Sequence, residues 1–283
     1  MKIPARIEQI TPDWGVVNRA PYPPLGFLPF AESQLGNGDC FGLYWPFGRE
    51  HDDPLVVETQ HDEWGVSPSF SSLDRFLTAV CGSDEWVEPP SLEDDPGSPY
   101  ACLKAAEEML RHNDVEHAAS QLVVATTALP EFGAAQWLLS RQMSRLGRAS
   151  EAFAAARAAV LSPPCFGGAS TEALAWLRRQ TQCPAEFADD PLWMRRDELK
   201  FEFGGAKDNQ DYPVLRDLIA EYQKAGLGVQ AMLLLQTYGE LMFQETVSFQ
   251  ERYGFSVERH IEAQLRLGRE VGVDRRVRTE AAL

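Results

Sequence analysis

The chain has 283 residues, enough for two domains, and its 44% hydrophobic and 24% charged residues are typical of a folded protein in water. No apolar run approaches the ~20 residues that a membrane-spanning helix needs, which argues against a membrane protein. The net charge is −16, and residues 1–98 hold 17 Asp and Glu against 5 Lys and Arg, so this part would repel nucleic acid and attract a basic partner.

Cysteine usage and the first residues indicate a reducing compartment. The five cysteines are widely spaced and never form a CxxC pair, so we expect neither a disulfide framework nor a zinc ribbon. The N-terminal stretch MKIPARIEQITPDW lacks the apolar core of a secretory signal, which favours a cytoplasmic protein. An acidic surface can keep a protein soluble as well as bind a basic partner, so the composition alone does not distinguish these two roles.

The front of the chain predicts an extended segment that leads into a sheet. Residues 1–34 are rich in proline and predict a wrapping segment, with a short helix over residues 29–35. A cluster of turn residues, Gly36–Asp39, follows. Phe41–Trp45 then has the aromatic and aliphatic composition of a strand.

Two further strands and a helix complete this region. Pro54–Gln60 has the composition of a buried strand, and Trp64 indicates a third strand that Pro68 interrupts. Ser69–Val80 changes to helical spacing and predicts a helix that closes the sheet. Residues 1–82 are therefore expected to form an α+β domain.

The chain after this region changes character twice. Residues 83–99 combine acids and prolines with little apolar surface to bury, so they predict a linker. Residues 100–283 are rich in alanine and predict an all-α domain with helices to about residue 271. Beyond the repeats described next, the candidate helices are Ala173–Thr181, Pro191–Lys200, Val214–Lys224, Val229–Phe249 and Val257–Val271.

Two copies of a sequence repeat with a period of about 34 residues lie within residues 99–166. The small, turn and proline positions recur, since Asn113, Ala118, Ala125 and Pro130 correspond to Gly147, Ala152, Ala159 and Pro164. Such spacing suits paired helices that approach each other at small residues and end at proline. The pattern resembles two degenerate tetratricopeptide repeats, and it does not continue into a third period.

The sequence lacks the motifs of common enzyme classes. There is no GxSxG elbow, no phosphate-binding GxxxxGK[ST] loop and no GxGxxG after a strand. His51–Asp53 and His61–Glu63 resemble metal-binding or acid–base clusters, but neither has the ligand spacing of a helical metal site. We favour solvated loop charge and expect no enzyme activity, cofactor or metal. A metal-dependent hydrolase that uses both clusters is the weaker alternative.

The stretch GNGDCFGLYWP, followed by PLVVETQHDEW and SFSSLDRFL, resembles the SUKH superfamily over about Leu25–Val80. Gly38 and Asp39 before an aromatic strand, a second strand with Pro54 and Val57, and a terminal Phe-Leu helix occur in the family order. The superfamily includes yeast regulators of cell-wall synthesis, and its domain is α+β, with a curved sheet flanked by helices. Many bacterial members are immunity proteins that neutralise polymorphic toxins, often nucleases. The resemblance therefore implies non-enzymatic protein recognition.

The resemblance and the acidic front domain favour a bacterial immunity protein that binds a basic toxin, and neither nucleic acid nor membrane. We expect the contact region among the acidic and aromatic residues of the SUKH-like domain, namely Asp39, Tyr44, Trp45, Glu50, Asp52, Asp53, Asp62, Glu63 and Trp64. For at least two of these three aromatics we prefer a place in the core of the sheet. The alternative function is a scaffold or regulatory adaptor whose helical repeats bind a peptide.

Overall fold

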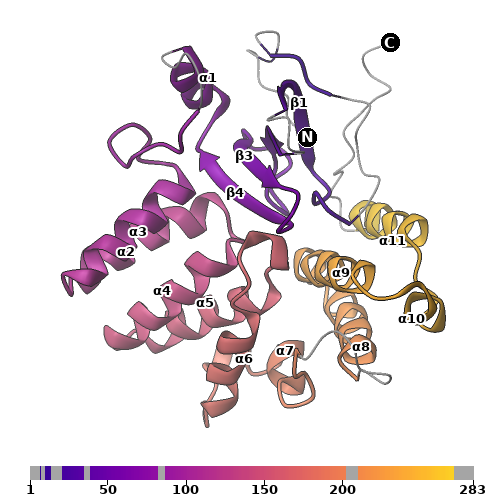
Figure 1. The fold of residues 1–283 in the computed structure, drawn as a ribbon. Coiled ribbons are helices and arrows are strands. Elements are labelled where there is room, and N and C mark those ends of the chain that lie inside the picture. Colours follow the sequence, from indigo (N-terminus) through magenta and orange to yellow (C-terminus); the bar gives the residue numbers. More distant parts are fainter. Residues whose placement is uncertain are drawn as a thin grey trace.

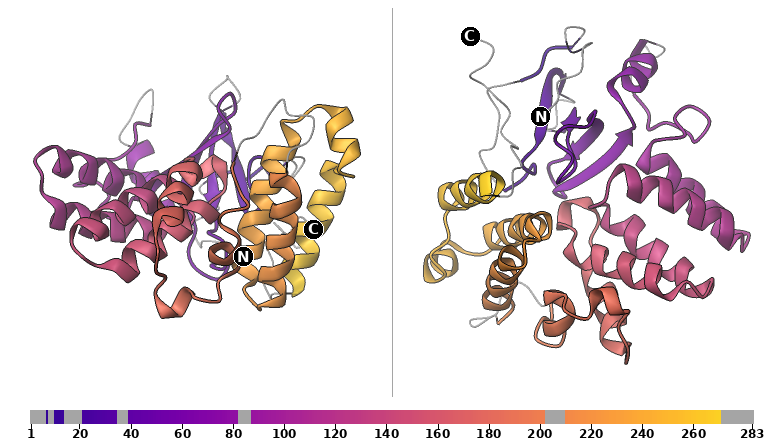
Figure 2. Two further views of the ribbon diagram at one scale, coloured as in Figure 1. Left: turned by 90° about the horizontal axis from the view of Figure 1, so that it is seen from below. Right: turned by 180° about the vertical axis from the view of Figure 1, so that it is seen from behind.

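The computed structural model of the chain describes residues 7, 10–13, 21–34, 39–81, 87–201 and 210–270. Its N-terminal part forms a small antiparallel sheet and the remainder is mostly helical, as predicted (Figure 1). The helices fan out around the sheet in chain order from α2 (Pro99–Arg111) to α11 (Val257–Glu270), and the view from behind in Figure 2 shows the sheet at the centre of this fan. None of the helices in these ranges is long and apolar enough to cross a membrane.

The sheet has four strands in sequential order, each antiparallel to the next. They are β1 (Phe27–Gln34), β2 (Cys40–Tyr44), β3 (Leu55–Gln60) and β4 (Gly65–Phe70). The strands predicted at Phe41–Trp45 and Pro54–Gln60 are confirmed as β2 and β3. The helix predicted within Ser69–Val80 is confirmed as α1 (Leu73–Cys81).

The short helix predicted over residues 29–35 is wrong, because residues 29–34 belong to strand β1 and residue 35 lies outside the described residues. Phe27, at the start of the strand, pairs with Tyr44 of β2 and is buried. Pairing provides backbone hydrogen bonds and burial together, which outweighs a weak local preference for helix. An isolated bridge between Pro12 and Phe30 covers part of the outer edge of β1.

Strand β4 forms the other edge of the sheet and continues through Pro68, where the sequence predicted its interruption. Proline is tolerated at a sheet edge because no neighbouring strand needs its missing N–H. The strand therefore reaches Phe70, and it packs beside α2.

Both faces of the sheet are buried, with alternate residues on opposite sides. Tyr44 and Val57 pack into one hydrophobic core with the first helices of the fan, whereas Leu43 and Val56 pack into a second core with α1. A strand without a solvent face needs apolar residues on both sides, which accounts for the continuous run Leu55–Val57.

The first helices form two similar antiparallel hairpins. Helix α2 pairs with α3 (Val115–Ala128), and one period later in the sequence α4 (Gly133–Arg145) pairs with α5 (Ala149–Leu161). The turn residues Asn113 and Gly147 have positive φ values of 61° and 73°. In each turn the next residue donates its N–H to the carbonyl five positions earlier, at 2.9 Å. This closure needs a left-handed residue, which favours asparagine or glycine at that position.

A third hairpin of the same kind lies outside the predicted periodicity. It consists of α8 (Asp211–Lys224) and α9 (Gly228–Phe243). Its turn residue Gly226 has a φ of 73°, and the bond from Leu227 N to Tyr222 O closes the turn at 2.9 Å. Because the distance in sequence from Gly147 to Gly226 is not a whole number of periods, periodicity misses this hairpin. An alanine at most 1% exposed lies five residues after each turn residue, at Ala118, Ala152 and Ala231.

Between residues 87 and 270, the other helical elements that the structure describes are α6 (Ser170–Arg179), α7 (Pro191–Arg195), α10 (Val247–Arg252), η2 (Pro164–Phe166) and η3 (Ala185–Phe187). The helix predicted over Pro191–Lys200 ends at Arg195, and the one predicted over Val229–Phe249 is interrupted after Phe243. There the Gln250 side-chain amide donates to the carbonyls of Phe243 and Glu245. A side chain that satisfies free carbonyls stabilises the helix end.

Residues 87–98, the part of the predicted linker that the structure describes before α2, are tied to the sheet by hydrogen bonds. Asp95 is buried and accepts from the N–H of Ser71 at 2.7 Å and from its hydroxyl at 2.6 Å. Ser98 caps α2, and its own hydroxyl donates to the carbonyl of Ser69 at 2.6 Å. Helix α2 therefore begins at a fixed position against β4.

A buried glutamate joins the sheet to the hairpins. Glu131, between α3 and α4, is 1% exposed. Its Oε1 atom accepts from the Tyr44 hydroxyl at 2.6 Å and from Phe47 N at 2.9 Å. The bond from Tyr44 crosses the shared core, so it fixes the sheet against the connection between the two hairpins.

A second buried glutamate joins η2 to the last helices. Glu240 on α9 accepts from Cys165 N at 3.1 Å and from the Gln236 side chain at 2.7 Å. Gln236 in turn accepts from Gln264 of α11 at 2.7 Å. Burial raises the pKa of Glu240 to about 7. This network holds α9 and α11 to the centre of the molecule.

The first prediction concerns the bond between Tyr44 and Glu131. Replacing Tyr44 with phenylalanine keeps the ring but removes the hydroxyl that donates to a buried carboxylate. We expect the free energy of unfolding, measured by urea denaturation, to fall by about 1.5–3 kcal/mol. The matched control is Tyr100→Phe, because the half-buried Tyr100 hydroxyl forms no hydrogen bond within the described ranges. An equal loss of stability in both variants would contradict this role for Tyr44.

The second prediction concerns His260, which is 4% exposed and packs against Gly239 and Phe255. Burial lowers its pKa from 6.5 to about 4. The neutral ring thus contributes stability that is fully present above pH 6.5 and is lost as the pH falls towards 4, by about 3 kcal/mol in total. We expect His260→Leu to unfold with a smaller loss of stability between pH 6.5 and 4 than the unmodified chain.

Glu240 changes stability in the opposite direction, since its raised pKa gives stability below pH 4.5 that is lost as the pH rises to 7. It is present in both proteins of the comparison, so its contribution cancels. The control is His51→Leu, because His51 is exposed. Identical pH dependence in His260→Leu and the unmodified chain would contradict the prediction.

Candidate functional site

The two acidic histidine clusters lie at opposite ends of β3. The His51–Asp53 loop joins β2 to β3, and the His61–Trp64 turn joins β3 to β4. A six-residue strand is about 20 Å long, so these clusters do not form one site. In the described ranges no group of three His, Cys, Asp or Glu side chains could hold a metal ion. A metal-dependent hydrolase that uses both clusters would require the two loops to lie together, and in the structure they lie apart.

The His51–Asp53 loop is exposed, but the glutamate before it is not. Glu50 is 3% exposed, and its Oε1 atom accepts from Gly48 N at 3.1 Å, which shapes the loop from within. Asp52 lies 3.6 Å from Arg49 in an exposed ion pair. Of the acidic residues predicted here, Asp52 and Asp53 are thus accessible and Glu50 is not.

The two aromatic residues at the end of β2 are also inside the protein. Tyr44 and Trp45 are both 0% exposed and belong to the cores on opposite sides of the sheet. The Tyr44 ring also packs against Phe166, with 5.1 Å between the centroids. A partner cannot reach either side chain in the folded protein, so the predicted contact region cannot include them.

At the other end of β3, the structure brings Asp39 to the His61–Trp64 turn. Asp39 Oδ1 accepts from His61 N at 2.8 Å and lies 2.9 Å from His61 Nδ1. His61 Nε2 lies 3.0 Å from Asp62 Oδ1. The hydrogen bond with Asp39 and the charges of Asp39 and Asp62 raise the pKa of His61, against an opposing effect of desolvation. Asp39 thus fixes the turn, while Asp62 and Glu63 remain exposed.

Trp64 holds this turn against the helical part of the chain. It has a positive φ of 54°, is half-buried, and its ring lies between Tyr22 and Phe243, with centroid distances of 5.4 and 5.2 Å. The Tyr22 hydroxyl accepts from Gln60 N at 3.0 Å and donates to the carbonyl of Gly65 at 2.8 Å. Burial, the main cause, raises the pKa of Tyr22 well above its ordinary value. Both ends of the turn are therefore anchored.

A groove of about 340 Å³, which we call the β4 groove, lies beside this turn. It runs between β4, the start of α2 and η2. Its apolar lining includes Val66, Pro68, Leu103, Phe132 and Phe166, and its polar lining includes Gln60, Glu63, Tyr100 and Lys104. Glu63 belongs both to the turn and to the groove, so the exposed acids and the groove form one continuous surface.

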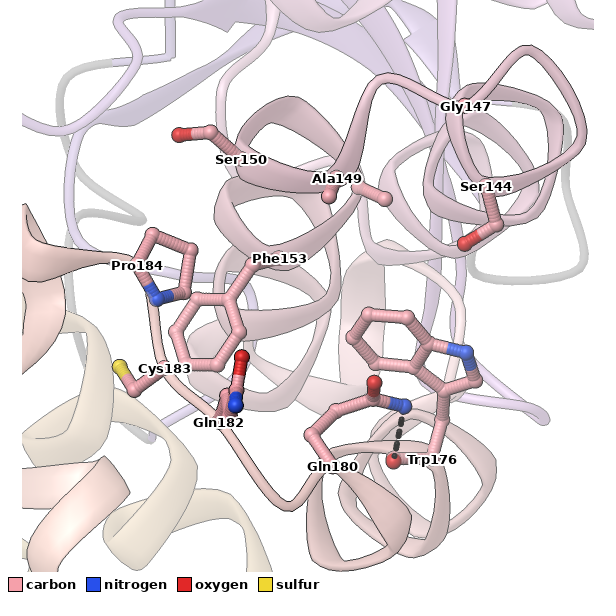
Figure 3. Close-up of a pocket in the computed structure, with 11 residues that line it drawn as sticks. Ser144, Gly147, Ala149, Ser150, Phe153, Trp176, Gln180, Gln182, Cys183 and Pro184 are labelled. Atoms are coloured by element: carbon pink, nitrogen blue, oxygen red, sulfur yellow. Dashed lines mark hydrogen bonds between the residues drawn. The ribbon is translucent and has the colours of Figure 1, made fainter.

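A second groove, of about 510 Å³, lies at the outer ends of the second hairpin and α6 (Figure 3), and we call it the hairpin groove. It is lined by the aromatic rings of Phe153 and Trp176 and by uncharged polar residues such as Ser144 and Gln182. The Gln180 side chain, which also lines it, donates to the carbonyl of Trp176 at 3.1 Å. None of the described residues that line this groove is acidic, in contrast to the β4 groove.

Sequence reasoning found the acidic turn but not the groove beside it. Its lining residues Val66 of β4, Tyr100 of α2, Phe132 and Phe166 come from segments far apart in the chain, and no local pattern connects these segments. The contact between Asp39 and His61 follows from the register of β2 and β3, which pairs Cys40 with Thr59 and so places Asp39 next to the turn after β3. That register depends on the whole sheet, so it follows only from the fold.

Comparison with known proteins gives two matches to family models and one to a full-length protein. The models of the YfbP N-terminal domain and the YfbP C-terminal domain match residues 12–88 and 202–279. The chain is 34% identical over 270 residues to "Uncharacterized protein YfbP" of Escherichia coli (strain K12), covering 91% of this chain and 92% of that protein. No solved structure matches the chain significantly. Trp64 lies in the first matched region and Phe243 in the second, so their contact joins the two.

The third prediction tests the bond that fixes the turn. Because the hydrogen bond with Asp39 is the main cause of the raised pKa of His61, Asp39→Asn should shift that pKa back towards 6.5. NMR titration of the imidazole resonances measures this shift. The matched control is Asp53→Asn at the other end of β3, which should leave the His61 titration unchanged. A His61 pKa that does not fall in Asp39→Asn would contradict the arrangement.

Proposed function

The chain belongs to the YfbP family, and from this premise we propose that it is a protein-binding module that recognises a basic partner through the His61–Trp64 turn. The observation that carries this proposal is the placement of Asp62 and Glu63. Both carboxylates are exposed, while the backbone that presents them is anchored by Asp39 on one side and by the rings around Trp64 on the other. A fixed acidic surface attracts a basic partner and limits the freedom lost on binding.

The more specific form of the proposal is a cytoplasmic bacterial immunity protein that neutralises a basic toxin, such as a nuclease. The resemblance of Leu25–Val80 to the SUKH superfamily supports it, together with a four-stranded sheet followed by helix α1 in this region. An acidic surface can occupy the part of a nuclease that otherwise holds phosphates. The partner is then a protein, and neither nucleic acid nor membrane is bound.

A second candidate function is a scaffold or adaptor that binds a peptide through its helical part. The hairpins α2–α3 and α4–α5, which lie one period apart in the sequence, support the interpretation as degenerate tetratricopeptide-like repeats. The specific observation in favour is the hairpin groove, because its aromatic rings and uncharged polar rim suit a peptide backbone and apolar side chains. This function would depend on Ser144 and Gln182 and not on the acidic turn.

The fourth prediction separates these functions by co-expression with any toxin domain that is encoded beside the gene. The full chain should protect the cells and co-purify with one toxin. Asp62→Lys with Glu63→Lys should abolish both effects, because the reversed charges repel a basic surface. The matched control, Asp52→Lys with Asp53→Lys, makes the same charge change at the other end of β3 and should leave protection intact.

The adaptor function makes the opposite prediction for a third variant. Ser144→Arg with Gln182→Arg places two long side chains at exposed positions of the hairpin groove, and the immunity function expects no effect on protection. Protection that depends on these two positions and not on Asp62 and Glu63 would favour binding through the helical groove. Absence of protection and of any complex with the unmodified chain would refute the immunity function.

A further inference from the structure

The β4 groove has the chemistry of a site for a flat organic cation. Its walls carry the rings of Tyr100, Phe132 and Phe166, and aliphatic residues from β4 and α2 complete them. Aromatic faces attract cations, and the groove already shows this property, because Lys104 Nζ lies 5.7 Å from the centroid of the Tyr100 ring. With about 340 Å³ of space, the groove lies near the lower limit for small-ligand sites, which suits one long side chain.

The groove also holds an accessible carboxylate. Glu63 lines it, is exposed, and forms no hydrogen bond or ion pair within the part of the chain that the structure describes. Its neighbour Asp62 is different, because its carboxylate lies 3.0 Å from His61 Nε2. Of the acids at this turn, Glu63 is therefore the one with a carboxylate ready for a ligand in the groove.

The positive charge in the lining is already compensated. Lys104 Nζ lies 2.9 Å from Glu107 Oε2 on the same helix. This pair lowers the repulsion that an entering cation would meet from Lys104, although the lysine still competes for the face of Tyr100. A cation that stacks on a ring and binds a carboxylate with two parallel hydrogen bonds would have the advantage over a point charge such as an ammonium.

We propose that the β4 groove receives one arginine side chain of the protein partner, with the guanidinium bound by Glu63 and stacked on the Tyr100 ring. This inference rests on the proposed function, because it names the residue type that a basic partner presents to the acidic turn. The arginine acts as the buried anchor of the interface, and the exposed carboxylate of Asp62 beside it selects for basic neighbours.

The fifth prediction uses a small probe, Nα-acetyl-arginine N-methylamide, titrated into the full chain and followed by backbone amide NMR. We expect saturable shifts at Gly65, Val66 and Ser67, which line the groove and carry N–H groups. The citrulline analogue has the same shape without the charge, and the anionic Nα-acetyl-glutamate N-methylamide tests for a site that prefers to bind at Lys104. Neither should give saturable shifts at these residues.

Variants test the roles of the two charged residues in the groove. Glu63→Gln should weaken binding of the arginine probe about tenfold, because a charged hydrogen-bond pair is lost. Glu116→Gln makes the same change at an exposed position of α3 and should leave binding unchanged. Lys104→Gln should tighten binding, since it removes the competing cation and frees Glu107.

The outcomes separate this proposal from the function on which it rests. Equal binding of arginine and citrulline, preference for the glutamate probe, or no saturable shift up to the solubility limit would each overturn the arginine site. If the arginine site fails while protection from a toxin still requires Asp62 and Glu63, only the anchor is wrong. If the arginine probe binds as expected but no toxin is neutralised, the proposed function fails and the groove remains a guanidinium site.

Discussion

The bond between the Tyr44 hydroxyl and the Glu131 carboxylate, 2.6 Å long, is the interaction on which the position of the sheet depends. A carboxylate that is 1% exposed loses several kcal/mol of hydration, so it is tolerated only where hydrogen bonds offset that loss. Tyr44 lies on the inner face of β2, and a shift of register by one residue would turn it to the other face. The buried carboxylate of Glu131 therefore favours a single position of the sheet against the hairpins. Apolar packing alone would distinguish this position less sharply from a shifted one.

The same junction determines how the acidic turn is presented. Trp64 follows directly from the turn after β3 and packs against Phe243, in the last turn of α9. Helix α9 is itself held to η2 through Glu240 and Cys165. The turn thus rests on an element that the core has already fixed, and a partner that binds Asp62 and Glu63 meets a surface with little left to order. Low ordering cost favours affinity without additional contact area.

Much of the sheet could be predicted from the sequence, and most of the contacts that fix the site could not. Phe41–Trp45 and Pro54–Gln60 are recognisable because they are short, apolar and bounded by turn residues. Strand β1 is missed because its local composition favours helix weakly and only pairing with β2 decides its state. The helices of the third hairpin are predicted, as Val214–Lys224 and Val229–Phe249, but its likeness to the first two hairpins is missed because Gly226 falls outside their spacing. The neighbours of Trp64 come from residues 22 and 243, and nothing local in the sequence brings them together.

Stability and the position of the acidic turn are coupled in this arrangement. Glu240 and His260 are both buried on the last helices. Burial raises the pKa of Glu240 to about 7, so its contribution to stability is lost as the pH rises. Burial lowers the pKa of His260 to about 4, so its contribution is lost as the pH falls. Both helices pack on each other, and α9 carries Phe243. Any change that loosens α9 also removes the support of Trp64, and through it the fixed position of Glu63 beside the β4 groove. Helices α9 and α11 would therefore support the proposed partner binding without touching the partner, whereas α2 would contribute Tyr100 to the contact itself.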